Sequence, residues 1–325
     1  MPKSIMLPIS TPRFTTFHFL ANAGIIMSAN PALDNWYLNN TMQLKCKKDL
    51  HTHIDSPLLN ICTGLIWDVP TAKHFLFDRC FIKYCFHDII VAFLEQGYYV
   101  TFDGVDDYYV EGKSWYGDRH YAHDGLIYGV DDEKGIYHIA AYDKRWVYSF
   151  FETSQKGFAE GFLSPQIPEN QVNLIGVTVD PNASITLDVP QIKAGLENYL
   201  RGYEAPNAPD ADDFVYGIMV YERLRAYLQA LGEDTVTADR RVFRMLLENK
   251  KCMKDRLAAA EHERGIPEIS SCEYDAVIQL TEEIHFLYGK YLLQRKTDLL
   301  TDIDTRIELL QNKEKECLTG FCETI

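Results

Sequence analysis

The sequence predicts an α+β protein, with an antiparallel sheet in its first half and an all-helical second half. Two observations lead to this prediction. Between residues 98 and 151, short runs of alternating apolar and polar residues are separated by Gly- and Asp-containing turns, as in antiparallel strands. After residue 213, apolar residues recur every three or four positions, as in amphipathic helices. We therefore expect two domains, residues 1–187 and 188–325.

The first hundred residues carry weaker patterns than the rest. Residues 14–28 are apolar without clear helix caps, and 36–40 and 42–44 resemble strands. Residues 71–96 are expected to form a helix, because Thr71 can cap it, apolar residues follow at helical spacing and Gly97 can end it.

The later elements are predicted more firmly. Strands are expected at residues 98–102, 123–128, 136–141, 146–151 and within 172–187, with a short helix at 153–162. Asp188 and Pro190 together indicate a helix start, because Asp caps helices and Pro is favoured in the first turn. Helices are then expected at 214–231, 238–264, 273–300 and 301–318, and they should pack as a bundle.

Composition restricts the classes of partner. The 325 residues carry a formal net charge of −15, which repels phosphate backbones, so we expect no nucleic-acid partner. The sequence has no run of eighteen apolar residues and no export signal at its start, so we expect no membrane association and a cytoplasmic location. Eight cysteines are spread along the chain and are expected to be reduced thiols.

The most informative stretch for function is residues 116–132. His123 begins a predicted strand, a Gly/Asp turn follows, and the next strand ends at Asp143. Adjacent antiparallel strands can place Asp143 beside His123, where a carboxylate would hold the imidazole in one tautomer and raise its basicity. We therefore expect His123 and Asp143 to form a catalytic pair.

This pattern resembles a known family. A histidine that opens a strand, the hairpin sequence Gly129-Val130-Asp131-Asp132 and an aspartate about twenty residues after the histidine are similar to papain-like proteins. The closer similarity is to the group of butirosin-biosynthesis protein H, which is related to peptidases that trim double-glycine leaders. Residues 216–221 and 239–253 resemble relatives associated with nonribosomal peptide clusters.

The resemblance implies a papain-like first half and acyl or peptidyl transfer in antibiotic biosynthesis through a Cys-His-Asp site. It implies no bound cofactor, because the acyl group would arrive as a thioester on the phosphopantetheine of an acyl or peptidyl carrier protein and leave on an amine. The family's cysteine starts a helix near the N-terminus. The first cysteine here is Cys46, whose flanking lysines would favour the thiolate, and Cys62 is a second candidate nucleophile.

Two alternatives stay open at this stage. The chain could be a catalytically inactive papain-fold accessory protein that binds a carrier protein or a peptide product, whereas an active enzyme would take a small-molecule or peptide substrate. It could also be a metal-dependent hydrolase, because Asp49-Leu50-His51-Thr52-His53 resembles the Asp-x-His-x-His motif of amidohydrolases, and His51 and His53 could bind one metal ion. That reaction requires further ligands from a βα barrel.

Overall fold

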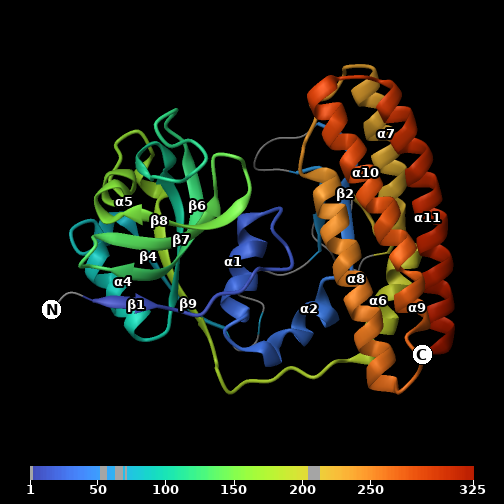
Figure 1. Cartoon of the computed structure of the whole chain (residues 1–325), viewed down its shortest axis with the longest axis horizontal. Coiled ribbons are helices and arrows are strands. Elements are labelled where there is room, and N and C mark those ends of the chain that lie inside the picture. The colour runs from blue at the N-terminus through green and yellow to red at the C-terminus, as the bar shows by residue number, and fades with distance from the viewer. Residues whose placement is uncertain (1–2, 52–56, 63–68, 70–71, 204–212) are drawn as a thin grey trace. The chain divides into compact units, whose positions relative to one another are not determined.

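A computed structural model describes residues 3–51, 57–62, 69, 72–203 and 213–325. The fold is α+β, as predicted, and divides into two compact units (Figure 1). The first unit combines Met1–Asp34 with Gly64–Ser184, and the second combines Asn35–Thr63 with Ile185–Ile325. The second boundary lies close to the expected one at 187. The expected division is wrong for residues 35–63, which pack with the helical half.

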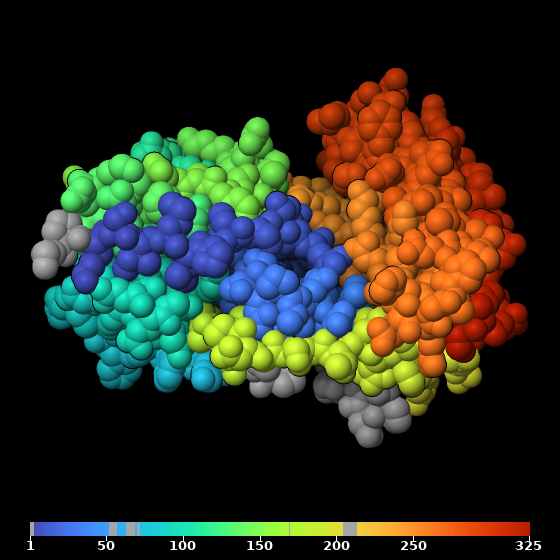
Figure 2. All heavy atoms as spheres, turned by 60° about the horizontal axis from the view of Figure 1, so that its bottom comes forward, coloured from blue at the N-terminus to red at the C-terminus, as the bar shows by residue number. Residues whose placement is uncertain are grey.

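The first unit is built on a seven-stranded antiparallel sheet. Its path is β4-β9-β5-β6-β7-β8, and β1 pairs with the second half of β6. The strands are β1 (Ser4–Met6), β4 (Ala72–Asp78), β5 (Tyr99–Asp106), β6 (Ala122–Asp131), β7 (Ile136–Tyr142), β8 (Tyr148–Ser154) and β9 (Asn173–Val179). The predicted meander of alternating residues therefore forms the four consecutive strands from β5 to β8, which reach one edge of this sheet. The residues around β1 (dark blue in Figure 2) lie on the surface of this unit.

Helices cover this sheet on both faces. The helices and 3₁₀ turns of the unit are α1 (His18–Met27), η1 (Pro31–Leu33), α3 (Arg79–Ile82), α4 (Phe86–Glu95), η3 (Asp107–Tyr109), α5 (Gln155–Phe162) and η4 (Glu169–Gln171). Apolar residues of α4 and α5, including Ile90 and Phe158, pack with Val100 and Phe102 of β5 in one core. Figure 1 shows α1 on the other face of the sheet, where it contacts β6 and β9.

The second unit is a helical bundle with a small sheet. Its elements are α2 (Asn35–Asn40), β2 (Leu44–Lys47), β3 (Leu59–Ile61), α6 (Val189–Arg201), β10 (Phe214–Tyr216), η5 (Gly217–Met219), α7 (Val220–Gly232), α8 (Val242–Arg264), α9 (Ile269–Glu273), α10 (Asp275–Gln294) and α11 (Asp298–Thr324). The strands pair antiparallel in the order β10-β2-β3. Buried Arg256 of α8 donates to the Leu38 and Tyr37 carbonyls at the end of α2, which attaches that early segment to the bundle.

Several early elements differ from the sequence prediction. Residues 71–96 were expected to be one helix, but Ala72–Asp78 is an antiparallel strand that pairs with β9. Conversely, residues within 14–28 and 36–40 form helices α1 and α2. Residues 214–216 are a strand rather than the start of a helix, because they complete the small sheet beside β2. Short apolar runs fit either structure, and pairing partners distant in the sequence decided these cases.

The predicted helix cap at residue 188 is confirmed. The Asp188 carboxylate accepts a hydrogen bond from the Gln191 amide at 2.9 Å, and Pro190 lies in the first turn of α6. Gly265 ends α8 in the left-handed conformation, as expected for a helix C-terminus. Among the described residues, no helix combines the length and the apolar character that a membrane span requires.

Candidate active site

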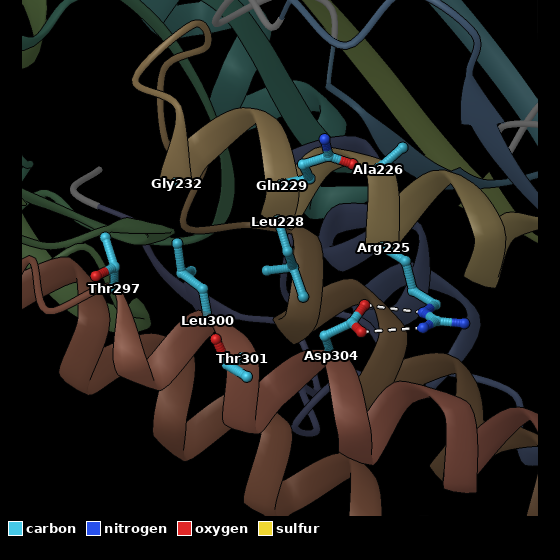
Figure 3. Close-up of a pocket in the computed structure, with 9 residues that line it drawn as sticks. All are labelled: Arg225, Ala226, Leu228, Gln229, Gly232, Thr297, Leu300, Thr301 and Asp304. Carbon is cyan, nitrogen blue, oxygen red and sulfur yellow. Dashed lines mark hydrogen bonds and ion pairs between the residues drawn. The ribbon is translucent and has the colours of Figure 1, made fainter.

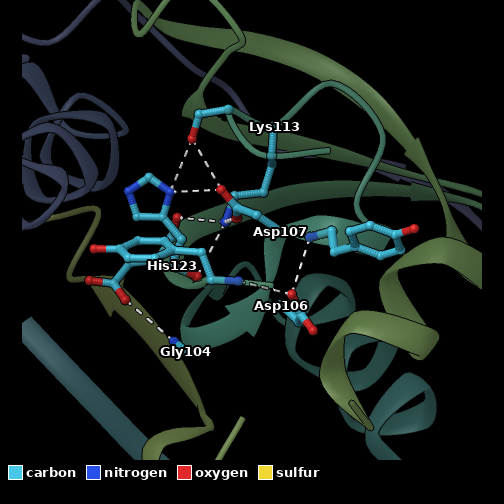
Figure 4. Close-up of polar contacts among 9 residues, drawn as sticks. Gly104, Asp106, Asp107, Lys113 and His123 are labelled. Carbon is cyan, nitrogen blue, oxygen red and sulfur yellow. Dashed lines mark hydrogen bonds and ion pairs between the residues drawn. The ribbon is translucent and has the colours of Figure 1, made fainter. Parts of the chain in front are cut away.

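His123 lies near the start of β6 and is held by Asp107, which directly follows β5. The His123 Nδ1 atom is 2.9 Å from Asp107 Oδ2 (Figure 4). Asp107 begins the turn η3, and its amide donates to the Tyr121 carbonyl at 3.0 Å, just before β6. The pairing of Val105 with His123 brings the end of β5 to this point. The sheet register therefore positions a carboxylate behind the imidazole.

Asp107 belongs to a buried ion pair. Lys113 Nζ is 2.6 Å from Asp107 Oδ1, and both side chains are fully buried. The remaining Lys113 donors are used by the carbonyls of His123 and Asp124, at 3.2 and 3.1 Å. Burial acts to raise the pKa of Asp107, but Lys113 and His123 outweigh it and lower that pKa below its usual value. Asp107 is therefore ionised at neutral pH.

The local chain is shaped to bury Lys113. Gly112, the residue before it, has φ of +92°, and a Cβ atom there would lie 2.4 Å from the Phe151 ring. Only glycine fits this position without strain. The Lys113 ammonium also lies 4.9 Å from the centre of the Phe102 ring. The turn at Gly112 therefore places the Lys113 ammonium beside the buried Asp107 carboxylate.

The hydrogen bonds specify the tautomer of His123. An ionised carboxylate accepts only, so Nδ1 carries the proton and donates to Asp107. Ser114 Oγ donates to the same Asp107 oxygen at 3.1 Å and lies 3.3 Å from His123 Nδ1. In the described part of the chain, Nε2 of His123 has no hydrogen-bonding partner and carries the lone pair. The side chain is 13% exposed. His123 has the arrangement of a general base.

A second imidazole, His18, lies against His123. The two ring centres are 4.4 Å apart and the rings are nearly perpendicular. His18 is the first residue of α1, and its Nε2 atom is buried without a hydrogen-bonding partner in the described residues. Burial, with the nearby positive charges of His123 and Lys113, holds the pKa of His18 well below its usual 6.5. His18 is therefore a neutral imidazole.

Aromatic side chains surround the two histidines. Tyr121, Tyr142 and Trp146 have ring centres 5.4, 6.1 and 6.2 Å from that of His123. Trp146 has φ of +61°, one of three positive values among the described non-glycine residues. A strained backbone of this kind is more frequent at functional sites than elsewhere. Trp115 packs on Trp146, and its indole Nε1 is buried without a hydrogen-bonding partner among the described residues.

Asp143 does not hold His123, so this part of the sequence prediction is wrong. Continuing the β6–β7 register from Leu126 and Ala140 does bring residues 123 and 143 opposite one another. The Asp143 carboxylate, however, accepts from the amides of Arg145 and Val147 and pairs with the Arg145 guanidinium at 2.9 Å. These local bonds close the turn after β7 and direct the carboxylate away from the imidazole.

Cys46 is also unsuited to the nucleophile role that the sequence predicted for it. It lies inside strand β2 of the second unit and is fully buried, while Lys45 and Lys47 point to the other side of the strand. Burial raises the pKa of Cys46 to about 12, and the charge of Arg223 offsets this only in part. The flanking lysines do not favour the thiolate, because successive side chains of a strand face opposite ways.

The first helix of the chain begins with a histidine and not with a cysteine. Helix α1 is the helix near the N-terminus, it begins at His18, and no cysteine precedes Cys46. Among the described residues, the hydrogen bonds and ring contacts of His123 go to nitrogen, oxygen and aromatic groups. Cys62, the second candidate, is partly exposed beside β3 in the other unit.

The metal-hydrolase alternative loses its structural basis. His53 lies outside the described residues, while His51 is exposed and its amide donates to the Asp49 side chain. The described strands pair antiparallel, so they do not form the βα barrel that this alternative requires. Within the described ranges, no group of three or more His, Cys, Asp or Glu side chains has the geometry to hold a metal ion.

A hollow in the helical unit was not anticipated from the sequence. It has a volume of about 640 Å³ and lies along α7 and α11, lined by Leu228, Gln229 and Leu300 among others (Figure 3). Arg225 and Asp304 close one part of it with two hydrogen bonds of 2.8 and 3.0 Å. Its polar lining includes the hydroxyl groups of Thr297 and Thr301 and the Asp304 carboxylate, which is paired with Arg225, so we place the candidate chemistry at His123.

Neither protein-family models nor curated proteins provide a relative with which this site can be compared. A scan against protein-family models finds no match to the chain, and a search of curated proteins finds none either. The assignment of the candidate site therefore rests on the geometry of the residues described above. Sequence reasoning found His123 but missed Asp107, Lys113 and His18. The adjacent pair Asp106-Asp107 at the end of a strong strand was a usable indication, whereas nothing local distinguished His18.

Proposed function

We propose that this chain transfers an acyl group from a thioester to an amine, with His123 as the general base and without a thiol of its own. The observation that supports this most is the hydrogen bond of His123 Nδ1 to buried Asp107. It leaves the basic Nε2 atom for a substrate proton. Asp107 stabilises the imidazolium that forms, and Lys113 keeps Asp107 ionised.

The reaction is balanced without any other reactant. The amine nitrogen attacks the thioester carbonyl carbon and forms the new C–N bond. His123 Nε2 accepts the proton that the nitrogen loses. The C–S bond breaks as the carbonyl re-forms, and the departing thiolate takes the proton from His123. The products are an amide and a free thiol. Because the thioester is already activated, a covalent acyl-enzyme is not required.

Two facts favour direct transfer over a cysteine intermediate. The helix nearest the N-terminus, α1, begins at His18 and not at a cysteine. Cys46 is buried and its pKa is raised to about 12, which disfavours the nucleophilic thiolate. A phosphopantetheine-bound acyl or peptidyl group on a carrier protein, in cytoplasmic antibiotic biosynthesis, is the donor that this proposal assigns.

The test uses the whole chain and an N-acetylcysteamine thioester with a primary amine. We expect amide to accumulate, as measured by mass spectrometry, and the rate to fall by about 10²–10⁴ in the His123→Gln variant. Cys46→Ala and protein treated with iodoacetamide should keep the wild-type rate, and intact-mass spectra should show no acylated protein. Loss of activity on alkylation, together with an acylated cysteine, would refute direct transfer.

A non-catalytic accessory protein is the second candidate. The observation that favours it is the small exposed fraction of His123, 13%, in a site without a thiol. It predicts binding of a carrier protein or peptide without amide formation. Calorimetry with a thioester-loaded carrier, run beside the aminolysis assay, separates the two candidates: binding with zero turnover supports the accessory role, and turnover that depends on His123 excludes it.

A further inference from the structure

We propose that His18 is a second catalytic residue of this site, and that its neutral imidazole donates a hydrogen bond to the carbonyl oxygen of the acyl group. This inference rests on the acyl transfer proposed above and specifies the group that would meet the substrate oxygen. The geometric basis is the 4.4 Å separation of the His18 and His123 ring centres, together with the unpaired, buried Nε2 atom of His18.

The unpaired nitrogen is the first step of the argument. A buried polar atom without a partner costs about 1–3 kcal/mol, so native proteins rarely retain one without a reason. In the tautomer that carries its proton on Nε2, His18 could donate to a carbonyl oxygen, and this bond would remove the cost. In the same region His123, Ser114 and Lys113 all contact Asp107, whereas the Trp115 indole Nε1 is a second buried nitrogen without a partner in the described residues.

The protonation state of His18 fits a donor and not a base. Its pKa lies well below 6.5 because of burial and the charges of His123 and Lys113, so near pH 7 it keeps a single N–H. In the described ranges no carboxylate is hydrogen-bonded to the His18 ring as Asp107 is to that of His123. The two imidazoles therefore divide the work: His123 accepts the proton of the amine, while His18 stabilises the negative charge that develops on the carbonyl oxygen.

A purely structural role for the His18 ring is the competing explanation. Its edge packs against Tyr142 and Tyr148, with ring centres 4.5 and 6.2 Å away. Phenylalanine would preserve much of this packing but has no N–H, whereas asparagine has an N–H but no ring. The two substitutions therefore separate packing from hydrogen bonding.

The first measurement is steady-state aminolysis by His18→Phe and His18→Asn. Loss of a donor to a developing oxyanion typically costs about 10²–10³ in kcat. We expect that loss in His18→Phe with KM nearly unchanged, and a kcat within about tenfold of wild type in His18→Asn. A wild-type kcat in His18→Phe, or equal losses in both variants, would overturn the inference.

The second measurement does not depend on turnover. A ketone isostere of the substrate, with CH₂ in place of sulfur, is bound to each variant and its carbonyl stretch is recorded by infrared spectroscopy. We expect the shift to lower frequency seen with wild type to persist in His18→Asn and His123→Gln, and to disappear in His18→Phe. His18→Leu serves as the donor-free variant if His18→Phe does not fold.

These outcomes separate the two proposals. If the carbonyl shift depends on His18 but the protein forms no amide, the acyl transfer is refuted. The hydrogen bond from His18 to the carbonyl oxygen is then still supported. Amide formation that depends on His123, with a carbonyl shift unchanged in His18→Phe and His18→Leu, would refute the role of His18 and keep the acyl transfer.

Discussion

Each of the two units buries a lysine beside a carboxylate, and the two clusters differ in how completely their polar atoms are paired. In the helical unit, Lys250 and Glu314 are fully buried and 2.8 Å apart. In the sheet unit, Lys113 and Asp107 are fully buried and 2.6 Å apart. Isolated burial of either charge would be costly, so each pair needs further hydrogen bonds to be tolerated.

The helical cluster is saturated. Glu314 accepts from the hydroxyl groups of Tyr199, Tyr221 and Tyr274, and Lys250 also donates to Tyr199 and to the neighbouring Asn249. These bonds join α6, α8 and α11 with the segments that begin α7 and α10. Complete pairing of this kind favours one arrangement of the helices over others.

The sheet cluster is incomplete on one side. Asp107 and Lys113 are paired, but the network continues to His123, whose Nε2 has no partner in the described residues, and next to it lies unpaired His18 Nε2. The helical cluster is fully paired, whereas the sheet cluster ends beside nitrogens that our proposals assign to the substrate. The following predictions test this difference, from the largest effect to the smallest.

Removing Glu314 should destabilise the protein most. Glu314→Ala leaves the Lys250 ammonium buried without its counter-ion, so we expect the free energy of unfolding to fall by about 3–5 kcal/mol. Urea denaturation followed by circular dichroism measures it. The control is Asp275→Ala, which breaks the exposed Lys254–Asp275 pair and should cost less than about 1 kcal/mol. Equal losses in the two variants would show that the buried cluster has no special role.

Asp107→Asn should slow aminolysis, whereas Asp143→Asn should leave its rate nearly unchanged. The amide no longer stabilises the imidazolium of His123, so we expect aminolysis to slow by at least about 10²-fold. Asp143→Asn alters contacts within its own turn, with Arg145, Val147 and Ser149, and its rate should stay within about threefold of wild type. If the Asp143 variant were the slower of the two, the sequence prediction would be right and the geometric assignment wrong.

His18 should make the protein sensitive to mild acid. Its folded pKa is lowered below 6.5, mainly by burial, so below pH 6.5 the unfolded chain binds a proton that the folded chain excludes. The free energy of unfolding should therefore fall as the pH decreases from 6.5 towards the folded pKa. His18→Asn removes this contribution, and urea denaturation at pH 7.5, 6.5 and 5.5 should give it the flatter profile.

The control for this pH series is His51→Asn, because His51 is exposed and its replacement should leave the wild-type slope unchanged. Parallel profiles for wild type and His18→Asn would mean that His18 is protonated as readily in the folded chain as in the unfolded one. Asp107 has a lowered pKa too, but its contribution is lost only at a more acidic pH, as the pH falls through that lowered value.

The smallest effect is expected at Cys46. Because it is fully buried and its pKa is raised to about 12, we expect iodoacetamide at pH 8 to modify exposed Cys80, Cys85 and Cys272 and to leave Cys46 unmodified. Peptide mapping by mass spectrometry gives the result. Modification of Cys46 at a rate equal to that of Cys80 would restore it as a candidate nucleophile.

Local patterns predicted the later part of the fold well. The strands around residues 98–154 and the capped helix at Asp188 follow from alternation and from capping, which depend on neighbouring residues. The early elements were less predictable. Ala72–Asp78 became a strand because β9 pairs with it, and residues 35–63 joined the second unit. Such contacts between distant segments produce no repeating pattern of apolar residues, so the sequence alone does not predict them.

The sequence by itself determined the α+β class and the order of its two kinds of structure, and it selected His123 as the candidate base. Only the tertiary structure decided which groups surround that histidine. The Asp143 carboxylate accepts hydrogen bonds from the amides nearest to it. Asp107, in the turn after β5, contacts the imidazole and is paired with buried Lys113. His18, which packs against His123, belongs to a helix more than a hundred residues earlier in the sequence. Spacing along the chain constrains neighbours, but the packing of separate elements selects the partners of a side chain such as His123.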